Sequence, residues 1–364
     1  MPQRPIRPKR SSLANRAIDA APDGSGPRVS VVIPTHNRSH LVTRAIESVL
    51  AQTYRGFELV VVDDASSDNT ADVVGRIDDP RLRYVRLPKN RGESGAQNAG
   101  IAEARGEWVA FLDDDDEWLP GKLECQLARV DELADAQIGA VLCRCSVRTE
   151  DGIRAPQRRG ELPEGEITDN LLAHKQLMTP SVYMAKRSAL LAAGGFDETM
   201  RWAQDQDLWL RLSQAGCHFA VVPQPLVIYN GEAGPNRMSL DCVTQLRGVV
   251  TMARRWGPLM RERLGEAEYE RWWANWSKRL RRHHRKFVRR LERRGDRGAA
   301  WRYVRGMTPA LPWGVWFVAR ALLVAAFGRL PYRAGRAAKA LAGRRSPPEL
   351  TDAVDVALPA ESKK

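Results

Sequence analysis

Cysteine is scarce in this chain of 364 residues, and its five cysteines are odd in number and dispersed. Disulfide-held secreted domains carry even sets of closely spaced cysteines, so the count excludes a disulfide framework and indicates a reducing compartment. Cys143 and Cys145 are separated by one residue and have no matching second pair, which excludes a zinc knuckle. On a strand these two side chains would share one face, where we expect them to pack.

Long apolar runs are scarce too. Residues 1–28 are rich in Pro, Arg and Ser and have no apolar core of signal-peptide length, so we expect a disordered basic arm there. Residues 346–364 are also expected to be disordered. Residues 309–330 form an apolar stretch, but Arg320 at its centre would cost ~2.5–3.5 kcal/mol to insert into a bilayer. We predict an interfacial helix there rather than a spanning one, with a soluble hairpin as the alternative.

Charge is unevenly distributed along the chain. The net charge is +13, yet residues 254–345 contain 25 Lys or Arg and 6 Asp or Glu, which leaves −6 for the rest. We therefore predict a mildly acidic module over 29–245 and a basic helical, membrane-associating region over 246–345. Its tryptophans and basic residues suit an anionic membrane surface. Arginines with interleaved aromatics can also bind nucleic acid, but no nucleic-acid fold accompanies them, and we expect no such partner.

The first half of the sequence alternates strand-like and helix-like segments. Apolar runs rich in β-branched residues occupy Val29–Pro34, Phe57–Asp64 and Glu107–Leu112. Apolar residues recur at helical spacing over 41–50, and a further helix is expected over 94–104. Apolar strands separated by helices of ~10–15 residues are typical of a Rossmann-like, mostly parallel sheet with helices on both faces. We predict an α/β fold with a basic α-helical C-terminal appendage.

The middle of the chain has a weaker pattern. We expect a strand over Pro180–Ala185, a helix over Lys186–Ala193 and a strand over His218–Val222. The segments over 148–176 and 231–241 are expected to be variable loops that line a substrate pocket.

Polar side chains follow three of the predicted strands. Thr35, His36 and Asn37 follow the first, Asp64 ends the second, and four aspartates, Asp113–Asp116, follow the third. Ligands of parallel sheets gather at the carboxyl ends of the strands. Four adjacent carboxylates repel one another unless a cation neutralises them, and Mg²⁺ and Mn²⁺ prefer oxygen ligands. The sequence thus predicts a divalent-metal site at this edge.

In order and spacing, these segments resemble the family 2 inverting glycosyltransferases, which have the GT-A fold. The matching pieces are VSVVIPTHNR, ELVVVDDASSDNT, KNRGESGAQNAGI, GEWVAFLDDDDEWLP, GGFDE and QDQDLWLRL. The resemblance implies metal-dependent transfer of a sugar from a nucleoside-diphosphate donor, expected to be UDP-linked, to a hydroxyl of a glycan or lipid-linked acceptor. It also implies a cytoplasmic enzyme of envelope polysaccharide synthesis, peripheral on the inner face of the plasma membrane.

Asp113, Asp114 and Asp115 match the DxD motif of that family. By this resemblance Asp115 is the direct ligand of Mn²⁺ or Mg²⁺ with Asp113 beside it, and Asp114 lies near the donor ribose. The cation would stabilise the diphosphate as the glycosidic bond breaks. Asp116 is expected only to cap the next helix, and a solvated acidic turn is the alternative for the whole group.

Asp64 matches the residue that accepts a hydrogen bond from the donor base, which suits uracil because its N3–H is a donor. The alternative is an Asx-type turn, although Asp63 can serve that turn. His36 falls where a ring lies against the base, unless it is a hydrogen-bonded turn histidine. Three further residues are expected to shape the donor pocket: Pro34, Thr35 and Asn37.

Asp205 matches the general base of the family. Inversion by one in-line displacement needs a base that takes the proton of the acceptor hydroxyl, although a helix-capping carboxylate would look the same. Gln204 replaces the usual Glu, and Gln97 replaces a common Arg. Gln204 favours an alternative, a GT-A-like binding or scaffold protein without turnover. A nucleotidyltransferase is a third interpretation, but PTHNRS lacks its Gly-rich basic signature.

Overall fold

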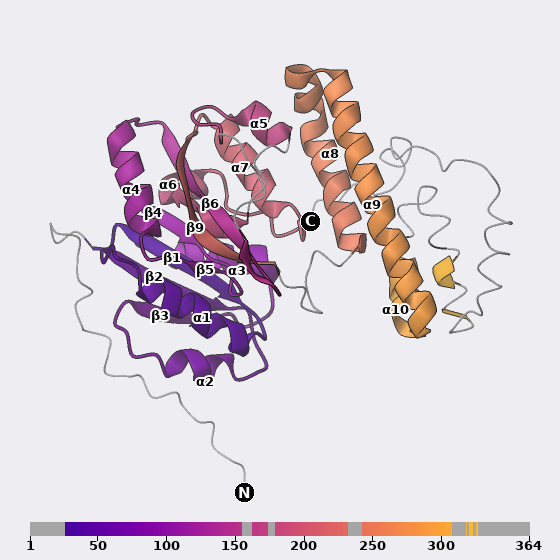
Figure 1. Ribbon diagram of the computed structural model, residues 1–364, viewed down its shortest axis with the longest axis horizontal. Helices are drawn as coiled ribbons and strands as arrows, with labels where there is room; N and C mark the ends of the chain where they lie inside the picture. The colour runs from indigo at the N-terminus through magenta and orange to yellow at the C-terminus, as the bar shows by residue number, and fades with distance from the viewer. Residues whose placement is uncertain are drawn as a thin grey trace, which may run out of the picture. The chain divides into compact units, whose positions relative to one another are not determined.

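The computed structural model describes residues 26–154, 162–173, 179–231, 242–307, 318, 320–322 and 325–326 (Figure 1). The described residues divide into two compact units. The first holds those of Met1–Thr199 and Gln204–Glu232, and the second those of Met200–Ala203 and Ala233–Lys364. The predicted arm before residue 26, the tail 346–364, and parts of both predicted variable loops lie outside the described residues. The predicted boundary at 245/246 falls inside a helix and stays a prediction.

The first unit is built on one mixed sheet. Its strands are β1 (Val29–Thr35), β2 (Phe57–Asp63), β3 (Leu82–Arg86), β4 (Trp108–Phe111), β5 (Glu117–Trp118), β6 (Ile138–Thr149), β7 (Gly152–Arg154), β8 (Tyr183–Lys186) and β9 (His218–Asn230). They are ordered β3-β2-β1-β4-β8-β6-β9-β5, with β7 paired to β6. The α/β class predicted from the sequence is confirmed.

The half of the sheet made by β3, β2, β1 and β4 is parallel, as predicted. Every residue of β1, β2 and β4 is buried, because helices cover both faces of a parallel sheet. The other half is mixed: β8 runs antiparallel to β4 and to β6, whereas β6 and β9 are parallel. The long pairing of β6 with β9 was not predicted, because polar and small residues interrupt the apolar pattern of β6.

Seven helices surround this sheet in the described residues. They are α1 (Ser39–Leu50), α2 (Thr70–Gly75), α3 (Gly92–Glu103), α4 (Lys122–Leu133), α5 (Thr168–Leu172), α6 (Arg187–Ala192) and α7 (Gln204–Gln214), with a 3₁₀ helix, η1 (Pro180–Val182). The strand predicted from Pro180 therefore begins only at Tyr183. Pro180 starts η1, and the Thr179 side chain accepts a hydrogen bond from the Ser181 amide.

The strand order reverses between β1 and β4. Connections through α1 and α2 step outward from β1 to β3, and α3 then returns across the sheet to β4. Right-handed crossovers place α1 and α2 on one face and α3 on the other. Such a reversal leaves a crevice beyond the carboxyl ends of the two strands, where ligands bind in open α/β sheets.

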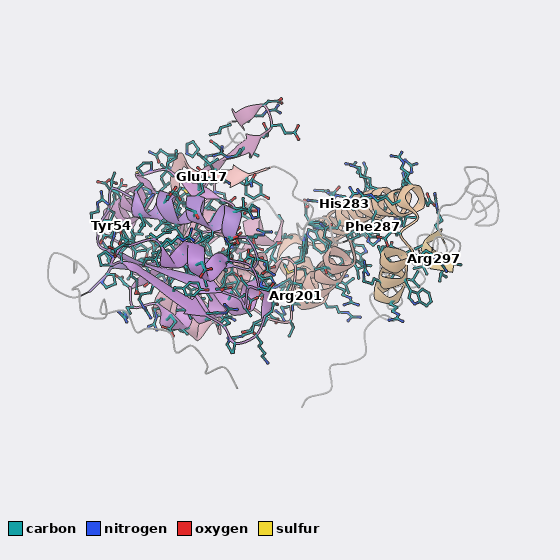
Figure 2. The ribbon with its side chains drawn as sticks, turned by 90° about the horizontal axis from the view of Figure 1, so that it is seen from below. Tyr54, Glu117, Arg201, His283, Phe287 and Arg297 are labelled. Atoms are coloured by element: carbon teal, nitrogen blue, oxygen red, sulfur yellow. The ribbon has the colours of Figure 1, made fainter. Side chains whose placement is uncertain are left out.

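The second unit is helical, as the composition of the appendage predicted. It contains α8 (Cys242–Leu264), α9 (Glu266–Arg294) and α10 (Arg297–Met307). Gly265 joins α8 to α9 and Gly295 joins α9 to α10, with φ values of 86° and 66° that favour glycine. His283 and Phe287 mark the middle of α9 (Figure 2). In the described residues, no helix combines the length and apolar composition that a bilayer span requires.

One long face of α9 is apolar and buried. Its buried residues recur at helical spacing and are Tyr269, Trp272, Trp273, Trp276, Leu280, His284, Val288 and Leu291. His284 Nδ1 lies 2.6 Å from the hydroxyl of Tyr303 on α10. Most of the predicted interfacial stretch 309–330 lies outside the described residues. Arg320 within it pairs with Glu292 of α9, Nε to Oε1 2.5 Å, which favours packing on the helices over insertion.

Candidate active site

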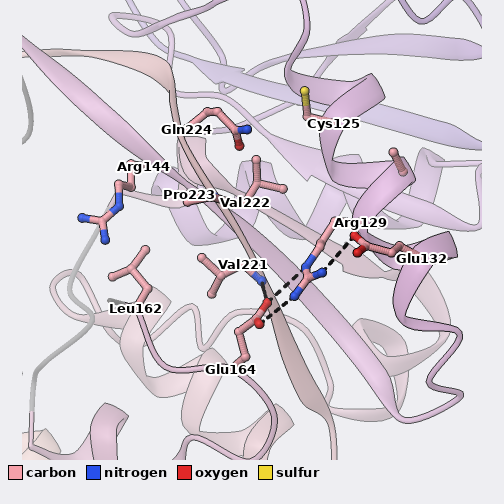
Figure 3. A pocket seen from close by; sticks show the side chains of 11 residues that line it. Cys125, Arg129, Glu132, Arg144, Leu162, Glu164, Val221, Val222, Pro223 and Gln224 are labelled. Atoms are coloured by element: carbon pink, nitrogen blue, oxygen red, sulfur yellow. Dashed lines mark hydrogen bonds and ion pairs between the residues drawn. The ribbon is translucent and has the colours of Figure 1, made fainter. Parts of the chain in front are cut away.

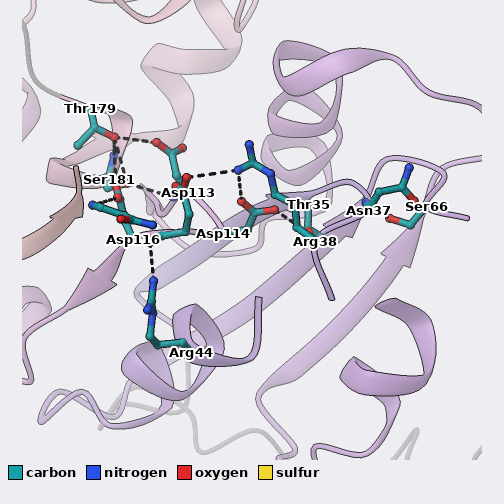
Figure 4. Close-up of polar contacts among 12 residues, drawn as sticks. Thr35, Asn37, Arg38, Arg44, Ser66, Asp113, Asp114, Asp116, Thr179 and Ser181 are labelled. Carbon is teal, nitrogen blue, oxygen red and sulfur yellow. Dashed lines mark hydrogen bonds and ion pairs between the residues drawn. The ribbon is translucent and has the colours of Figure 1, made fainter. Parts of the chain in front are cut away.

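The candidate site lies at the carboxyl ends of β1 and β4, where the strand order reverses (Figure 4). The Thr35 hydroxyl, at the end of β1, donates to Asp114 Oδ2 at 2.8 Å. Arg38, at the start of α1, donates through Nη1 to Asp114 Oδ1 at 2.8 Å. Asp114 is 5% exposed, and both its carboxylate oxygens are occupied by these residues of the β1 loop. The first strand and the aspartate cluster therefore form one structure.

The loop after β1 is locked to the loop after β2 by Asn37. Asn37 has a φ of 54°, which Asn tolerates better than most residues. Its backbone amide donates to Ser66 Oγ at 2.9 Å, and its side-chain oxygen accepts from the Ser67 amide at 2.7 Å. Its Nδ2 lies 3.0 Å from Nε2 of His36, whose ring is exposed. Asn37 thus fixes the loop after β1, where the sequence predicts the donor pocket, and the His36 ring stands exposed beside it.

The two aspartates after β2 have different roles. Asp63 is fully buried and accepts hydrogen bonds from the Ser66 amide at 2.8 Å and from the Tyr84 hydroxyl, so it makes the turn. Asp64 accepts from the amides of Arg91 at 2.7 Å and Gly92 at 2.8 Å. Asp64 therefore binds the start of α3. Each carboxylate oxygen has a second lone pair, so the predicted contact with a donor base remains open to it.

Asp115 is the most open of the last three aspartates. One of its oxygens lies 3.4 Å from Arg38 Nη1, and its carbonyl oxygen accepts from Arg44 Nη2 at 3.0 Å. Its side chain is 16% exposed, whereas that of Asp114 is 6% exposed. Asp115 is therefore the aspartate with most room for a further ligand.

Asp113 and Asp116 are bound to residues that precede β8. The Thr179 hydroxyl donates to Asp113 Oδ2 at 2.7 Å, and the Ser181 hydroxyl donates to Asp116 Oδ2 at 2.6 Å. The amide of Asn230 donates to the other oxygen of Asp116 at 2.8 Å. Asp116 is fully buried, so it fixes the end of β9 against the cluster rather than capping a helix at the surface.

These carboxyl groups do not ionise independently. Burial raises the pKa of Asp113 well above its ordinary value, and the charges of Glu93, Asp116 and Asp115 raise it further. Burial, followed by the charge of Asp115, raises the pKa of Asp116 to about 7 despite its hydrogen bonds. A proton or a cation must therefore relieve the crowding at neutral pH.

Asp205 lies in the first turn of α7 and is half-buried. Burial raises its pKa to about 6, although hydrogen bonds from the amides of Gln206 and Asp205 itself lower it. A carboxylate with this pKa is ionised at neutral pH and is still a better proton acceptor than a solvated aspartate. Asp205 thus has the properties that a general base requires.

Glu93, in the first turn of α3, connects the parts of the site electrostatically. Burial is the main cause that raises its pKa to about 7, and the charges of Asp205, Asp114 and Asp115 add to it, while Arg38 opposes them. Asp205 and the aspartates of the cluster are thus close enough to Glu93 for their charges to affect it. Asp64 binds the amide that immediately precedes Glu93. That Asp64, Asp115 and Asp205 share one cleft stays a prediction.

Three residues of the candidate site were not identified from the sequence: Glu93, Thr179 and Ser181. Glu93 belongs to a recognised segment, RGES, and its charge next to predicted site residues was a usable signal. Thr179 and Ser181 gave no signal, because their part in the site depends on how β8 pairs beside β4.

Asp113 and Asp115 offer oxygen ligands to a hard cation. The mutual repulsion of the neighbouring carboxylates favours the binding of such a cation. In the described residues, no group of three or more His, Cys, Asp or Glu side chains is arranged to hold a metal ion. Mg²⁺ typically takes one or two carboxylates together with substrate phosphates. The donor set therefore fits a cation that binds with a diphosphate, and does not fit a permanent protein-only metal centre.

A separate pocket of about 740 Å³ lies between α4, β6 and β9 (Figure 3). Arg129 on its wall pairs with Glu164, Nη2 to Oε2 2.8 Å, and Glu164 also accepts from the Val221 amide at 2.6 Å. None of the predicted site residues lines it. Arg129 and Glu164 of this pocket are thus already paired with each other. The site around Asp113–Asp116 remains the better candidate for chemistry.

Several known glycosyl transferases are similar to this chain in sequence. The family described as "Glycosyl transferase family 2" matches residues 30–191. The succinoglycan biosynthesis protein ExoO of Rhizobium meliloti is 48% identical over 122 residues, which are 34% of this chain and 33% of ExoO. A protein named for colanic acid biosynthesis glycosyl transfer, WcaA of Escherichia coli, is 31% identical over 194 residues, 52% of this chain and 67% of WcaA.

A third relative carries a more specific name, UDP-Glc:alpha-D-GlcNAc-diphosphoundecaprenol beta-1,3-glucosyltransferase WfgD of Escherichia coli. It is 42% identical over 100 residues, which are 28% of this chain and 40% of WfgD. Among solved structures, S. aureus TarS 1-349 gives a TM-score of 0.49 at 18% identity, covering 85% of this chain and 92% of that one. The mannosyltransferase PcManGT of Pyrobaculum calidifontis gives 0.48 at 22% identity, covering 95% and 90%.

Proposed function

Because this chain belongs to glycosyl transferase family 2, we propose that it transfers a sugar, with inversion, from a UDP-linked donor to a hydroxyl group. The acceptor is a glycan or lipid-linked glycan of envelope polysaccharide synthesis. The observation that supports this most directly is that the charges of the aspartate cluster and of Asp205 both act on Glu93, whose helix begins at the amides bound by Asp64.

In this proposal, one set of residues binds the nucleoside diphosphate of the donor, and another residue acts on the acceptor hydroxyl. Asp115, with Asp113 beside it, would hold a divalent cation, and that cation would neutralise charge on the departing diphosphate when bound. Asp114, which Thr35 and Arg38 hold in place, is the proposed contact of the donor ribose. Asp64 and His36 are the proposed contacts of the base, and Pro34 and Asn37 shape that pocket.

Asp205 is the residue that acts on the acceptor hydroxyl. The acceptor hydroxyl gives its proton to the Asp205 carboxylate as its oxygen attacks the anomeric carbon, and the bond from that carbon to the diphosphate oxygen breaks. The half-buried position and pKa of about 6 suit this step, because the group is ionised at pH 7. Gln204 beside it is buried and adds no second charge to the base.

A UDP donor and a lipid-linked acceptor are supported by the names of relatives. WfgD is named for UDP-Glc and a diphosphoundecaprenol-linked acceptor, and a Campylobacter jejuni relative, 43% identical over 110 residues, is named for a PP-undecaprenol-linked acceptor. The alignments cover 40% and 35% of those two proteins. An acceptor of that kind is embedded in a membrane, so the enzyme would work at its surface, on the cytoplasmic inner face of the plasma membrane.

The second unit supplies a surface suited to such a membrane. Over 278–294 the outer side of α9 carries nine exposed basic residues: Lys278, Arg279, Arg282, Arg285, Lys286, Arg289, Arg290, Arg293 and Arg294. Their helical positions fall within one half of the wheel, over about 24 Å of helix. We name these nine residues the α9 basic face. Anionic headgroups attract such a face by about 1 kcal/mol per Lys or Arg near the surface.

Donor hydrolysis tests the proposed function. The chain should release UDP from one UDP-sugar in the presence of Mn²⁺ or Mg²⁺, and chelation should stop the reaction. Asp115→Asn should weaken Mn²⁺ binding measured by calorimetry in the presence of UDP. Full hydrolysis by Asp115→Asn would refute the metal assignment. Donor binding without any turnover, in the presence of cell-envelope lipid extract, would favour the binding or scaffold alternative.

A further inference from the structure

Glu93 is an acidic residue of the crevice to which the chemistry above gives no role. It is the second residue of α3, whose preceding amides are bound by Asp64. Its side chain is half-buried, so part of it remains accessible to a ligand. Within the described residues, it makes no hydrogen bond or ion pair. A charged group with this burial normally has a partner, so one supplied by a ligand would be expected.

Glu93 is close to charged groups of both proposed half-sites. The charges of Asp205, of Asp114 and Asp115, and of Arg38 all act on it, and Arg38 in turn donates to Asp114 at 2.8 Å. The sugar being transferred is joined to the diphosphate at its anomeric carbon and is attacked there from the opposite face. It must therefore lie between the diphosphate-binding aspartates and Asp205, which is the space that Glu93 borders.

We propose that Glu93 binds the transferred sugar itself, by accepting hydrogen bonds from its hydroxyl groups. This inference rests on the proposed function and adds to it a residue that determines sugar specificity. A carboxylate has two oxygens and about four acceptor positions, so it can accept from two neighbouring hydroxyls at once. A nucleotide without a sugar would not reach it.

Gln97 gives this assignment independent support. Residues four apart on a helix share a face, so Gln97 stands one turn behind Glu93, and its side chain is directed back toward that first turn. It is fully buried, and neither its Oε1 nor its Nε2 has a hydrogen-bond partner among the described residues. An unpartnered amide one helical turn from Glu93 would orient that carboxylate when a sugar binds, which would make Gln97 a positioning residue for the same contact.

The test compares two ligands in one variant. Affinities for UDP and for a UDP-sugar are measured by calorimetry with Mn²⁺. The UDP-sugar is whichever of UDP-glucose, UDP-galactose and UDP-N-acetylglucosamine raises the Tm of the wild type most. In Glu93→Gln and Glu93→Leu, the affinity for UDP should stay within about twofold. The affinity for the UDP-sugar should fall about 10- to 100-fold, as expected for lost hydrogen bonds to a charged group.

The matched control is Glu103→Gln, at the other end of α3, where the side chain is exposed and pairs with Arg83, Nη2 to Oε2 2.6 Å. Both of its affinities should equal those of the wild type. Gln97→Leu should lower the UDP-sugar affinity by less than Glu93→Leu does, with UDP again unchanged.

Different failures have different meanings. If both Glu93 variants keep the wild-type ratio of UDP-sugar to UDP affinity, Glu93 does not bind the sugar, while the proposed function stands. If UDP binding is lost together with the sugar, Glu93 acts on the whole site and the inference is wrong. If the wild type binds none of the UDP-sugars, the proposed function fails, and the inference fails with it.

Discussion

The two units of this protein hold charge in opposite ways. In the first unit, carboxylates are buried at a strand end and their pKa values are raised by burial and by one another. In the second, nine basic side chains stand exposed on one side of α9 while its other side packs aromatic rings. Buried like charge is unfavourable until a ligand neutralises it, so it marks a binding site. Exposed like charge attracts a surface without fixing a geometry.

The largest expected effect concerns the half-buried charge of Asp205. Asp205→Asn keeps the shape of the side chain but removes the proton acceptor, so kcat for sugar transfer should fall about 10²- to 10⁴-fold. The KM for the donor should change little. UDP release is the measurement, and the exposed Asp151→Asn variant is the control. A loss of less than tenfold would mean that the buried carboxylate is not the base.

The exposed charge of α9 gives the next largest effect. Arg285, Arg289 and Arg293 lie on one side of the helix and are exposed. Changing all three to Gln should weaken binding to anionic vesicles by about 3 kcal/mol, roughly 100-fold, and binding should also fall with salt. Flotation with phosphatidylglycerol and with phosphatidylcholine vesicles measures it.

Three exposed basic residues of the first unit provide the matched control: Arg76, Lys89 and Arg105. Their change to Gln should leave vesicle binding unaltered. Equal losses in both triple variants would show that net charge acts, rather than the α9 basic face. Binding to DNA at moderate salt without binding to anionic vesicles would show that the partner of the α9 basic face is nucleic acid and not a membrane.

The pH dependence of turnover tests whether the buried base titrates as its surroundings indicate. The pKa of Asp205 is raised to about 6, so the group loses its proton above that pH and becomes active as a base. The rate should therefore fall about tenfold per pH unit below pH 6. A rate that stays constant down to pH 4 would contradict the assignment.

The smallest effect is on stability. The pKa values of Asp116 and Glu93 are raised to about 7 in the folded protein, so between about pH 4 and pH 7 the folded state binds more protons than the unfolded state. The free energy of unfolding should then fall as pH rises through this window, lowering the Tm by about 5 °C. Addition of Mn²⁺ with UDP should abolish this decrease in Tm. A Tm that rises steadily from pH 4 to pH 7 would contradict this.

Much of the first unit was readable from the sequence because its strands are buried on both faces. Continuous apolar runs predicted β1, β2 and β4, and their polar ends predicted the edge where the site lies. The later strands were harder to predict. β6 is half-exposed along its second half, and β9 extends to Asn230, well past the predicted end at Val222, through two prolines and a change of register.

The sequence by itself determined the family, the division between acidic and basic regions, and which aspartates stand near the site, because these depend on residue type and order. Only the tertiary structure decided which aspartate does what. Asp63 makes the turn and Asp64 binds the start of α3, although they are neighbours in the chain. Likewise, the charge of Asp205 acts on Glu93 because α3 returns across the sheet to β4, a proximity of residues far apart in the chain that no local pattern encodes.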